Sequence, residues 1–274
     1  IYYDPKLKLS EADPLGRDLY ISLGCMLENL SIAADYFGIF KDLKYVLTNN
    51  FVAEVYFQDS QPNKDLSYLV DTIPKRVNAR GFFESKPLPD KVQAEMMALK
   101  KDSRIRADII TDEERIEKLA SLTAQGLRLA YKRPTFRKEM FHWMFNSLSK
   151  TKRGLPGYSL RIPFIVSFII PTLVRFFDIS PLLAKLNYKS MTSVPFVCIL
   201  SSEESGPSVW LEIGRLAERY MLQLNSEGIK TSIFVASIEM GDLYKKVQEL
   251  IDSNLTPQFL FCAGYMENTQ PHSP

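Results

Sequence analysis

Two long stretches of the chain carry apolar residues at every third or fourth position, which is the pattern of an α-helix. The first covers residues 18–37 and is followed by Gly38; the second covers 207–227 and is followed by Gly228. Glycine often follows the C-terminus of a helix because it readily adopts positive φ. The first stretch is apolar on most of its faces, which is typical of a buried helix. We therefore expect two long helices that end at glycines.

Shorter patterns predict the remaining elements. Helices are expected after Pro89 through Leu99, from a Thr111 cap to about Ala130, after Pro134, and over 243–251. Strands are expected at 44–47, 51–57, 104–110, 194–200, 233–236 and 258–262, with loops over 58–70 and immediately before Val194. Thr111 is the expected cap because Glu114 follows three residues later, as in a capping box. This order of elements predicts an α+β or α/β protein with a central sheet.

The longest apolar run, Ile162 to Val174, contains two prolines. It is shorter than the ~20 residues that a helix needs to cross a bilayer, so no membrane span is expected. A short buried helix and a flap over an apolar cavity are the two interpretations of this run.

Composition places the chain among ordinary globular proteins. Its 274 residues suit one large domain or two small ones, and 46% of them are hydrophobic. The formal charge is only +2, so charge does not indicate a nucleic-acid partner. No segment resembles a secretion signal, and we expect a cytoplasmic location.

Familiar catalytic chemistry is missing from the sequence. Cys25, Cys198 and Cys262 each lie among apolar residues, and His142 and His272 are the two histidines. These residues favour buried reduced thiols over a disulfide or a metal site. The chain contains no GxSxG, no P-loop lysine motif and no GxGxxG. No catalytic side chain is therefore named.

The two long helices align with each other at one constant offset, 21–39 over 211–229, without gaps. The identical positions are Gly24 and Gly214, Glu28 and Glu218, Gly38 and Gly228, and Ile39 and Ile229. An internal duplication would let each helix cover its own copy, as two subunits do in a symmetric dimer. The alternative is two unrelated amphipathic helices that share a glycine stop.

The same residues carry a family resemblance. Residues 16–38, GRDLYISLGCMLENLSIAADYFG, resemble the helix signature of the nitroreductase superfamily, most of all the branch of TM nitroreductases and Acg-like proteins. Further resemblances follow in the expected order at PKRVNAR (74–80), WLEIG (210–214) with Glu218 and Arg219, SIE (237–239) and PQFLFCAGY (257–265).

The resemblance implies an α+β, nitroreductase-like fold, with mostly antiparallel sheets flanked by helices. It also implies two fused repeats that form a pseudo-dimer: a degenerate repeat at 1–65, and a second at 66–274 with a lid-like insertion around 150–190. One compact monomer that mimics a dimer is expected.

The resemblance further implies FMN as cofactor. Guanidinium groups suit a phosphate dianion, so Arg76 and Arg80 are the candidate phosphate ligands, with Lys75 beside them. Asn78 stands where the family has Ser or Thr, and Glu239 matches a turn that faces the flavin ring edge. The other interpretation of Lys75, Arg76 and Arg80 is a solvated loop surface, and Glu218 is expected to be an interhelical or capping carboxylate.

The implied activity is transfer of hydride from NAD(P)H through the flavin to a nitroaromatic or quinone-like small molecule. Two alternatives stay open: an FMN-sequestering or redox-sensing protein with residues 161–177 as a lid, and a pseudo-enzyme without flavin. Cys262 stands where the family commonly has arginine. We also expect the intact protein to carry a flavin-facing segment before Ile1 and an arginine pair after Ser273-Pro274.

Overall fold

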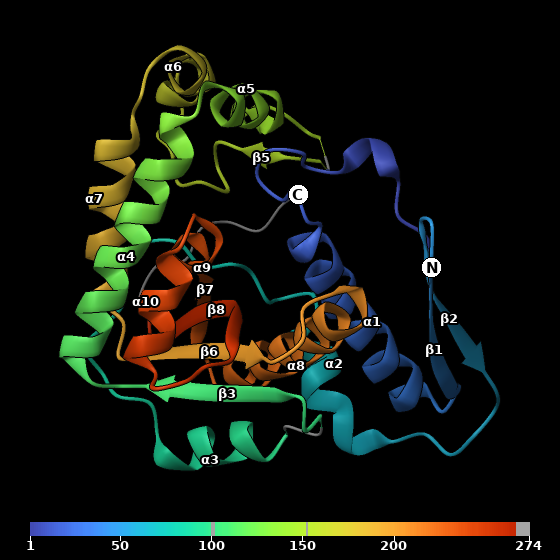
Figure 1. Ribbon diagram of the computed structural model, residues 1–274. Helices are drawn as coiled ribbons and strands as arrows, with labels where there is room; N and C mark the ends of the chain where they lie inside the picture. The colour runs from blue at the N-terminus through green and yellow to red at the C-terminus, as the bar shows by residue number, and fades with distance from the viewer. Residues whose placement is uncertain (100–101, 152, 267–274) are drawn as a thin grey trace.

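A computed structural model describes residues 1–99, 102–151 and 153–266 (Figure 1). The helices are α1 Arg17–Phe37, α2 Ser67–Thr72, α3 Asp90–Ala98, α4 Glu113–Lys132, α5 Pro134–Trp143, α6 Ile170–Phe176, α7 Ser180–Met191, α8 Pro207–Ser226, α9 Ala236–Glu239 and α10 Leu243–Leu250. The strands are β1 Phe40–Thr48, β2 Phe51–Phe57, β3 Ile105–Ile110, β4 Met144–Phe145, β5 Leu155–Pro156, β6 Phe196–Ser202, β7 Lys230–Ile233 and β8 Thr256–Gly264. Short 3₁₀ turns are η1 Pro5–Leu7, η2 Lys64–Leu66 and η3 Val166–Phe168.

A four-stranded antiparallel sheet with the order β3-β6-β8-β7 forms the centre of the molecule. Every residue of β6 is buried, because helices cover both faces of the sheet. Side chains alternate along this strand: Phe196 and Cys198 belong to one hydrophobic core, and Val197 and Ile199 to the other. The sheet and its helices confirm the α+β class.

The two cores define two helical layers. The first contains side chains of α1, α3 and α8, among them Ile21, Val92 and Ile213. The second contains side chains of α4, α7, α9 and α10, among them Ile116, Met191, Ile238 and Val247. The hairpin β1–β2 adds a smaller core outside the first layer, where Val52 and Ala53 contact Leu27 and Leu211.

Helices α1 and α8 cross at the two aligned glycines. A Cβ atom on Gly24 would lie 2.9 Å from Cα of Gly214 and still closer to the carbonyl oxygen of Leu211. A Cβ atom on Gly214 would lie 3.0 Å from Cα of Gly24 and still closer to the carbonyl oxygen of Ile21. The helix backbones are therefore in direct contact, which a side chain at either position would prevent.

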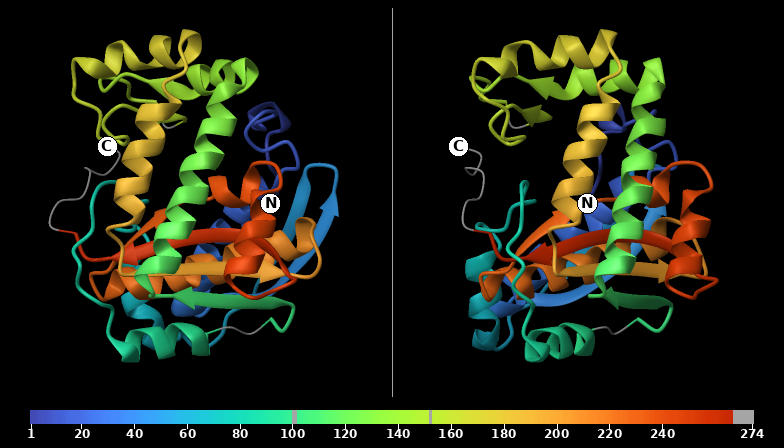
Figure 2. Two further views of the ribbon diagram at one scale, coloured as in Figure 1. Left: turned by 60° about the vertical axis from the view of Figure 1, so that its left-hand side comes forward. Right: turned by 90° about the vertical axis from the view of Figure 1, so that its left-hand side faces the viewer.

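Two helices extend far beyond the sheet. Figure 2 shows α4 and α7 side by side, with α5 and α6 across their distal ends. No helix among residues 1–99, 102–151 and 153–266 combines the length and the apolar character that a bilayer span requires.

The structure confirms both long helices to within a residue or two at each end, and the glycines that follow them have φ of 72° and 76°. The hairpin and its Asn49-Asn50 turn are also confirmed. The cap of α4 was wrongly predicted: Asp112, not Thr111, accepts a hydrogen bond from Arg115 N at 2.9 Å. The two residues are adjacent, and both are residue types that cap helices.

Three other predicted elements were wrong, and so was the interpretation of residues 162–174 as a short buried helix. The loop expected before Val194 contains α7, and α2 lies in the loop expected over 58–70. The strand expected at 233–236 ends at Ile233, and the chain then turns into α9 where Ala236 meets Gly126 of α4. Most residues of the apolar run 162–174 are not buried: within α6 only Val174 is, because that helix packs on α5 along one side.

Candidate functional site

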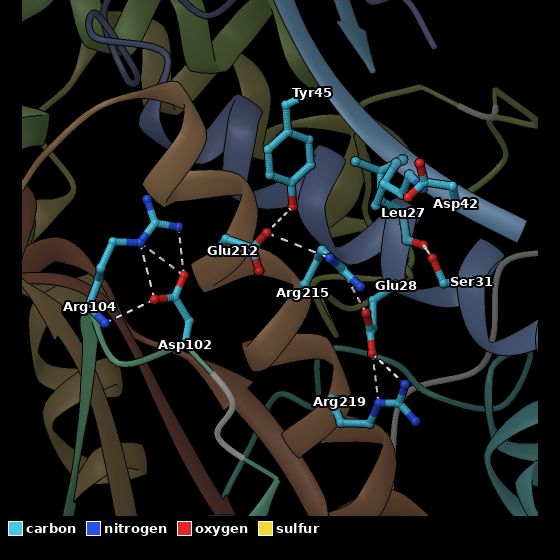
Figure 3. Close-up of polar contacts among 11 residues, drawn as sticks. Leu27, Glu28, Ser31, Asp42, Tyr45, Asp102, Arg104, Glu212, Arg215 and Arg219 are labelled. Carbon is cyan, nitrogen blue, oxygen red and sulfur yellow. Dashed lines mark hydrogen bonds and ion pairs between the residues drawn. The ribbon is translucent and has the colours of Figure 1, made fainter. Parts of the chain in front are cut away.

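The interface of α1 and α8 holds a set of ion pairs (Figure 3). Glu28, buried on α1, accepts hydrogen bonds from Arg215 Nε at 3.0 Å and from Arg219 Nε at 2.6 Å. Tyr45 of β1 donates a hydrogen bond to Glu212, which also lies 3.6 Å from Arg215 Nη1. Burial and the neighbouring Glu212 raise the pKa of Tyr45. These bonds connect α1 and β1, near the N-terminus, to α8.

Glu218 of α8 occupies the corresponding position on the other side of the crossing. Its Oε1 accepts from Asn29 Nδ2 at 3.0 Å and from Arg76 Nε at 2.9 Å, and its side chain is fully buried. Glu28 aligns with Glu218 at the offset of the two helices, and Asn29 aligns with Arg219. Each glutamate therefore bonds to the residue that follows the other glutamate. The expectation of an interhelical carboxylate at Glu218 is confirmed.

The segment 74–80, which contains most of the predicted site residues, is anchored to the core. Ala79 N donates to Thr231 O of β7 at 2.8 Å, and Asn78 Oδ1 accepts from Ile233 N at 2.9 Å. Arg76 reaches α8 through Glu218. Lys75 lies on the surface. The segment is thus fixed to two elements of the central layer, although Arg80, like Lys75, is exposed.

Arg80 lies where this segment approaches α4 and the distal part of the chain. Surrounding atoms lower the pKa of its guanidinium by partly excluding water, and Tyr131 of α4 opposes the shift. Arginine nevertheless stays charged in proteins. The backbone oxygen of Arg80 accepts from Arg161 Nη1 at 2.7 Å. Two arginines and a tyrosine from three separate segments therefore meet here.

Glu239, at the end of α9, lies beside the start of α1. Its Oε1 is 3.2 Å from Arg17 Nη2, and the carboxyl of Asp18 is close enough to influence its protonation. Burial raises the pKa of Glu239 to about 9, and the negative charge of Asp18 adds to the shift while Arg17 opposes it. The side chain of Glu239 is 15% exposed and that of Asp18 is 41% exposed, so we place the shared proton on Glu239.

The three thiols are not poised for reaction. Burial raises the pKa of Cys25, Cys198 and Cys262, so all three are protonated at neutral pH. Cys262 is a fully buried residue of β8. In the part of the chain that the structure describes, no group of three His, Cys, Asp or Glu residues is placed to hold a metal ion. His272 and Ser273-Pro274 lie outside the described residues.

A cavity of about 390 Å³ lies between the N-terminal segment and the distal helices. It is lined by Leu7, Leu9, Met140, Trp143, Arg153, Gly154 and Leu155. None of the predicted site residues lines it, so it is a separate feature from segment 74–80.

The structure therefore holds Arg76, Asn78 and Arg80 on one anchored segment, with Lys75 beside them, and pairs Glu239 with Arg17. Sequence reasoning missed Arg17, Asp18, Tyr131 and Arg161. These four come from distant parts of the chain, so no spacing pattern pointed to them.

No protein-family model and no curated protein matches the sequence. Similar solved structures include the FMN-dependent nitroreductase NfnB from Mycobacterium smegmatis in complex with NADPH, with a TM-score of 0.48 and 15% identity over 77% of this chain and 96% of that one. Nitroreductase A from Vibrio parahaemolyticus has a TM-score of 0.45 and 12% identity over 76% and 71%. The NADPH:FMN oxidoreductase from Vibrio harveyi complexed with NAD+ has a TM-score of 0.45 and 11% identity over 76% and 72%.

Proposed function

We propose that the protein binds FMN at the anchored segment 74–80 and acts as an NAD(P)H-dependent flavin oxidoreductase of the nitroreductase type. The single observation that carries the proposal is the anchoring of this segment by Ala79 and Asn78 to β7, because it holds a group of cations in place. A phosphate dianion is bound best by donors that are already fixed before it arrives. The family resemblance of the motifs along the chain supports the same proposal.

The four candidate residues of segment 74–80 are not equally suited to bind the phosphate. Arg80 and Lys75 suit it, because the guanidinium and ammonium groups are cations at the anchored segment. Arg76 Nε is already bonded to the buried Glu218, and Asn78 Oδ1 to the backbone of β7. We therefore assign the main phosphate contacts to Arg80 and Lys75 and give Arg76 and Asn78 the role of holding the segment.

When bound, FMN would supply the hydride chemistry, with a nitroaromatic or quinone-like molecule as acceptor. The chain's own residues would bind and orient it. Glu239 would present a neutral carboxyl near pH 7, because its pKa is raised to about 9. A neutral carboxyl is a hydrogen-bond donor as well as an acceptor, whereas a carboxylate only accepts.

Glu28 of α1 bonds to Arg219 of α8, and Glu218 of α8 bonds to Asn29 of α1. These reciprocal contacts support a pseudo-dimer of two fused repeats, with residues 1–65 as the first and 66–274 as the second. The agreement continues past the helices, because β1 begins at Phe40 and β7 begins at Lys230, which keeps the offset of the two helices. An isologous dimer has this property: residue i of one copy contacts residue j of the other, and the reverse.

A second candidate function is FMN sequestration or redox sensing without turnover. One contact favours it: Arg161, at the start of the proposed lid 161–177, donates to the backbone oxygen of Arg80. The insertion around 150–190 is thus connected to the proposed phosphate segment. A lid that stays over the flavin would exclude both the nicotinamide and the acceptor.

The visible spectrum of the purified protein tests the proposal. We expect a flavin spectrum, or its appearance after FMN is added, and bleaching by NADPH in the absence of oxygen. A bound flavin that NADPH does not reduce would favour sequestration. A colourless protein that takes up no FMN would overturn both functions and favour a pseudo-enzyme.

Substitutions in segment 74–80 test which residues bind the FMN phosphate. Arg80→Ala and Lys75→Ala should each weaken FMN retention about tenfold, the usual effect of losing one charge-assisted hydrogen bond to a phosphate. Arg128→Ala, at an exposed arginine of α4, is the matched control and should leave retention unchanged. Equal retention in all three variants would show that the phosphate assignment is wrong.

A further inference from the structure

Positive charge is concentrated in one part of the chain. Residues 128–189, which we call the basic apolar segment, contain twelve lysines and arginines and two acidic residues, Glu139 and Asp178. The rest of the chain contains 22 basic and 30 acidic residues. A protein with a formal charge of +2 therefore combines a strongly basic segment with an acidic remainder.

The same segment exposes large apolar side chains. These are Leu129, Leu148, Phe164, Ile165, Val166, Phe168, Ile169, Phe176, Phe177, Leu182 and Leu186. Single apolar residues on a surface are ordinary, but a contiguous group of them marks an interaction site. Seven of these residues lie between positions 164 and 177, on η3, α6 and the turns that flank them.

Cations and apolar groups share this surface. On α7, Leu182, Lys185, Leu186 and Lys189 are all exposed and fall at the i, i+3, i+4 and i+7 positions of one helix face. The guanidinium of Arg175 lies 5.2 Å from the ring centre of Phe176 and 4.9 Å from that of Phe141. The surface is therefore basic and apolar over the same residues.

The apolar part of this surface, on η3 and α6, lies at the distal end of the molecule, and α7 runs from there back toward the sheet. Both views in Figure 2 place α5 and α6 beyond the ends of α4 and α7, away from the sheet. Such a position allows contact with a large flat partner without interference from the sheet and its helices.

Charge indicates which partner covers the surface. A second copy of this chain, docked through the same surface, would bring two strongly basic segments together, which like-charge repulsion opposes. An anionic bilayer complements both properties, because lipid phosphates attract lysine and arginine while aromatic and aliphatic side chains enter the interface. The apolar run is too short to cross a bilayer but long enough to insert at its surface.

We propose that the basic apolar segment docks the protein on the surface of membranes that contain anionic lipid, with Phe164 and Ile165 inserted and Arg175 and Lys185 facing lipid phosphates. This inference does not depend on the flavin proposal, because none of the proposed phosphate residues takes part in it.

Co-sedimentation of the full chain with vesicles tests this proposal. The probes are vesicles of phosphatidylcholine alone and vesicles that also contain phosphatidylglycerol. We expect binding to the anionic vesicles to be at least about tenfold stronger than to the neutral ones, and to weaken as salt is raised, because salt screens the lysines and arginines. Equal binding to both kinds of vesicle, or binding to neither, would overturn the proposal.

Matched substitutions distinguish binding through this surface from non-specific binding through any exposed apolar residue. Ile165 is 76% exposed and Leu15, outside the segment, is 74% exposed; Phe164 is 55% exposed and Phe57 of β2 is 54% exposed. The pair Phe164→Ser and Ile165→Ser should lower binding to anionic vesicles about tenfold or more, because less apolar surface is buried. The pair Phe57→Ser and Leu15→Ser should leave binding unchanged.

A charge variant completes the test. Arg175→Glu with Lys185→Glu should also lower anionic binding about tenfold, since each cation contributes to attraction by the lipid surface. All substituted side chains are exposed, so circular dichroism is expected to show an intact fold. If the control pair loses as much binding as the test pair, or if Ile165→Ser instead abolishes a dimer in vesicle-free solution, the membrane proposal is wrong.

Discussion

At the scale of single residues, Glu239 couples protonation to stability. Its pKa in the folded protein, about 9, lies above the ordinary value of 4.5, so the folded state holds a proton that the unfolded state releases between these two values. The stabilisation is complete below pH 4.5 and is lost as the pH rises toward 9. We expect the free energy of unfolding to fall over this window by up to about 1.4 kcal/mol per pH unit.

The variant Glu239→Gln keeps a neutral hydrogen-bonding side chain at every pH. Between the unfolded-state pKa of 4.5 and the folded-state pKa of about 9, the unfolding midpoint of this variant should depend less on pH than that of the wild type. Denaturant titration at several pH values measures this dependence. Glu227→Gln, at an exposed position after α8, is the control and should keep the wild-type slope. A slope that Glu239→Gln does not change would show that the proton lies elsewhere.

Arg76 leads to a second residue-scale prediction. Its Nε is 2.9 Å from Oε1 of the buried Glu218, so Arg76→Ala leaves a buried carboxylate without its cation. We expect a loss of about 3 kcal/mol in the free energy of unfolding, measured with urea. Adding Glu218→Gln removes the uncompensated charge and should restore at least about 1 kcal/mol.

If Arg76→Ala leaves stability unchanged but lowers FMN retention, the guanidinium acts on the phosphate and not on the fold. The double-mutant cycle distinguishes these roles, because FMN retention alone would fall both when a ligand is lost and when the fold is weakened.

Sequence reasoning at this scale named a segment that the structure anchors to the core, but it did not identify the partner of each residue. Arg76 and Arg80 stood out because cations four residues apart suit a phosphate. The buried Glu218 and the half-buried Tyr131, which interact with them, belong to helices far away along the chain, and only folding brings them near. The same reason explains why Asp18 could not be connected with Glu239.

At the scale of elements, Gly24 and Gly214 determine how closely α1 and α8 approach. Replacing a helical glycine with alanine ordinarily stabilises a helix by about 1 kcal/mol. Here the new Cβ would meet the backbone of the partner helix, within 3.0 Å of a Cα atom and closer to a carbonyl oxygen. We therefore expect Gly24→Ala to destabilise the protein by about 2 kcal/mol or more, as overpacking does.

Thermal unfolding measures this effect, and Gly214→Ala should behave alike because its surroundings match. Ser22→Ala, at an exposed position of α1, gives the contrast: it should be neutral or slightly stabilising. If both glycine variants are as stable as Ser22→Ala, the two backbones are not in contact.

Elements were predictable where local signals agreed with their tertiary surroundings. The helices α1 and α8 combine strong periodicity with a glycine stop, so their ends could be placed closely. The strand expected at 233–236 was misplaced because Phe234 and Val235 are apolar for a different reason, contact with the second core. Helix α7 was missed although proline at its second position is a common helix start.

At the scale of the whole molecule, the apolar run 162–174 shows how burial can be misjudged from composition. A short buried helix was one of the two interpretations of this run, the other being a flap, yet most of its residues are not buried and lie at the distal end of the molecule. A sequence pattern indicates that a surface is apolar. It does not indicate whether the chain itself, a second copy or a membrane covers that surface.

The last prediction concerns the oligomeric state. In the proposed pseudo-dimer, the close helix crossing at Gly24 and Gly214 takes the place of an interface between two subunits. The basic apolar segment opposes self-association through like charge. We therefore expect a monomer of 31.4 kDa in vesicle-free solution at physiological salt, measured by sedimentation equilibrium. A dimer that persists on dilution would contradict the proposed pseudo-dimer, because the interface required for such a dimer is already occupied inside one chain. High salt is the control, because it screens the positive charges of the basic apolar segment. If two copies associate through this segment, they should do so first at high salt.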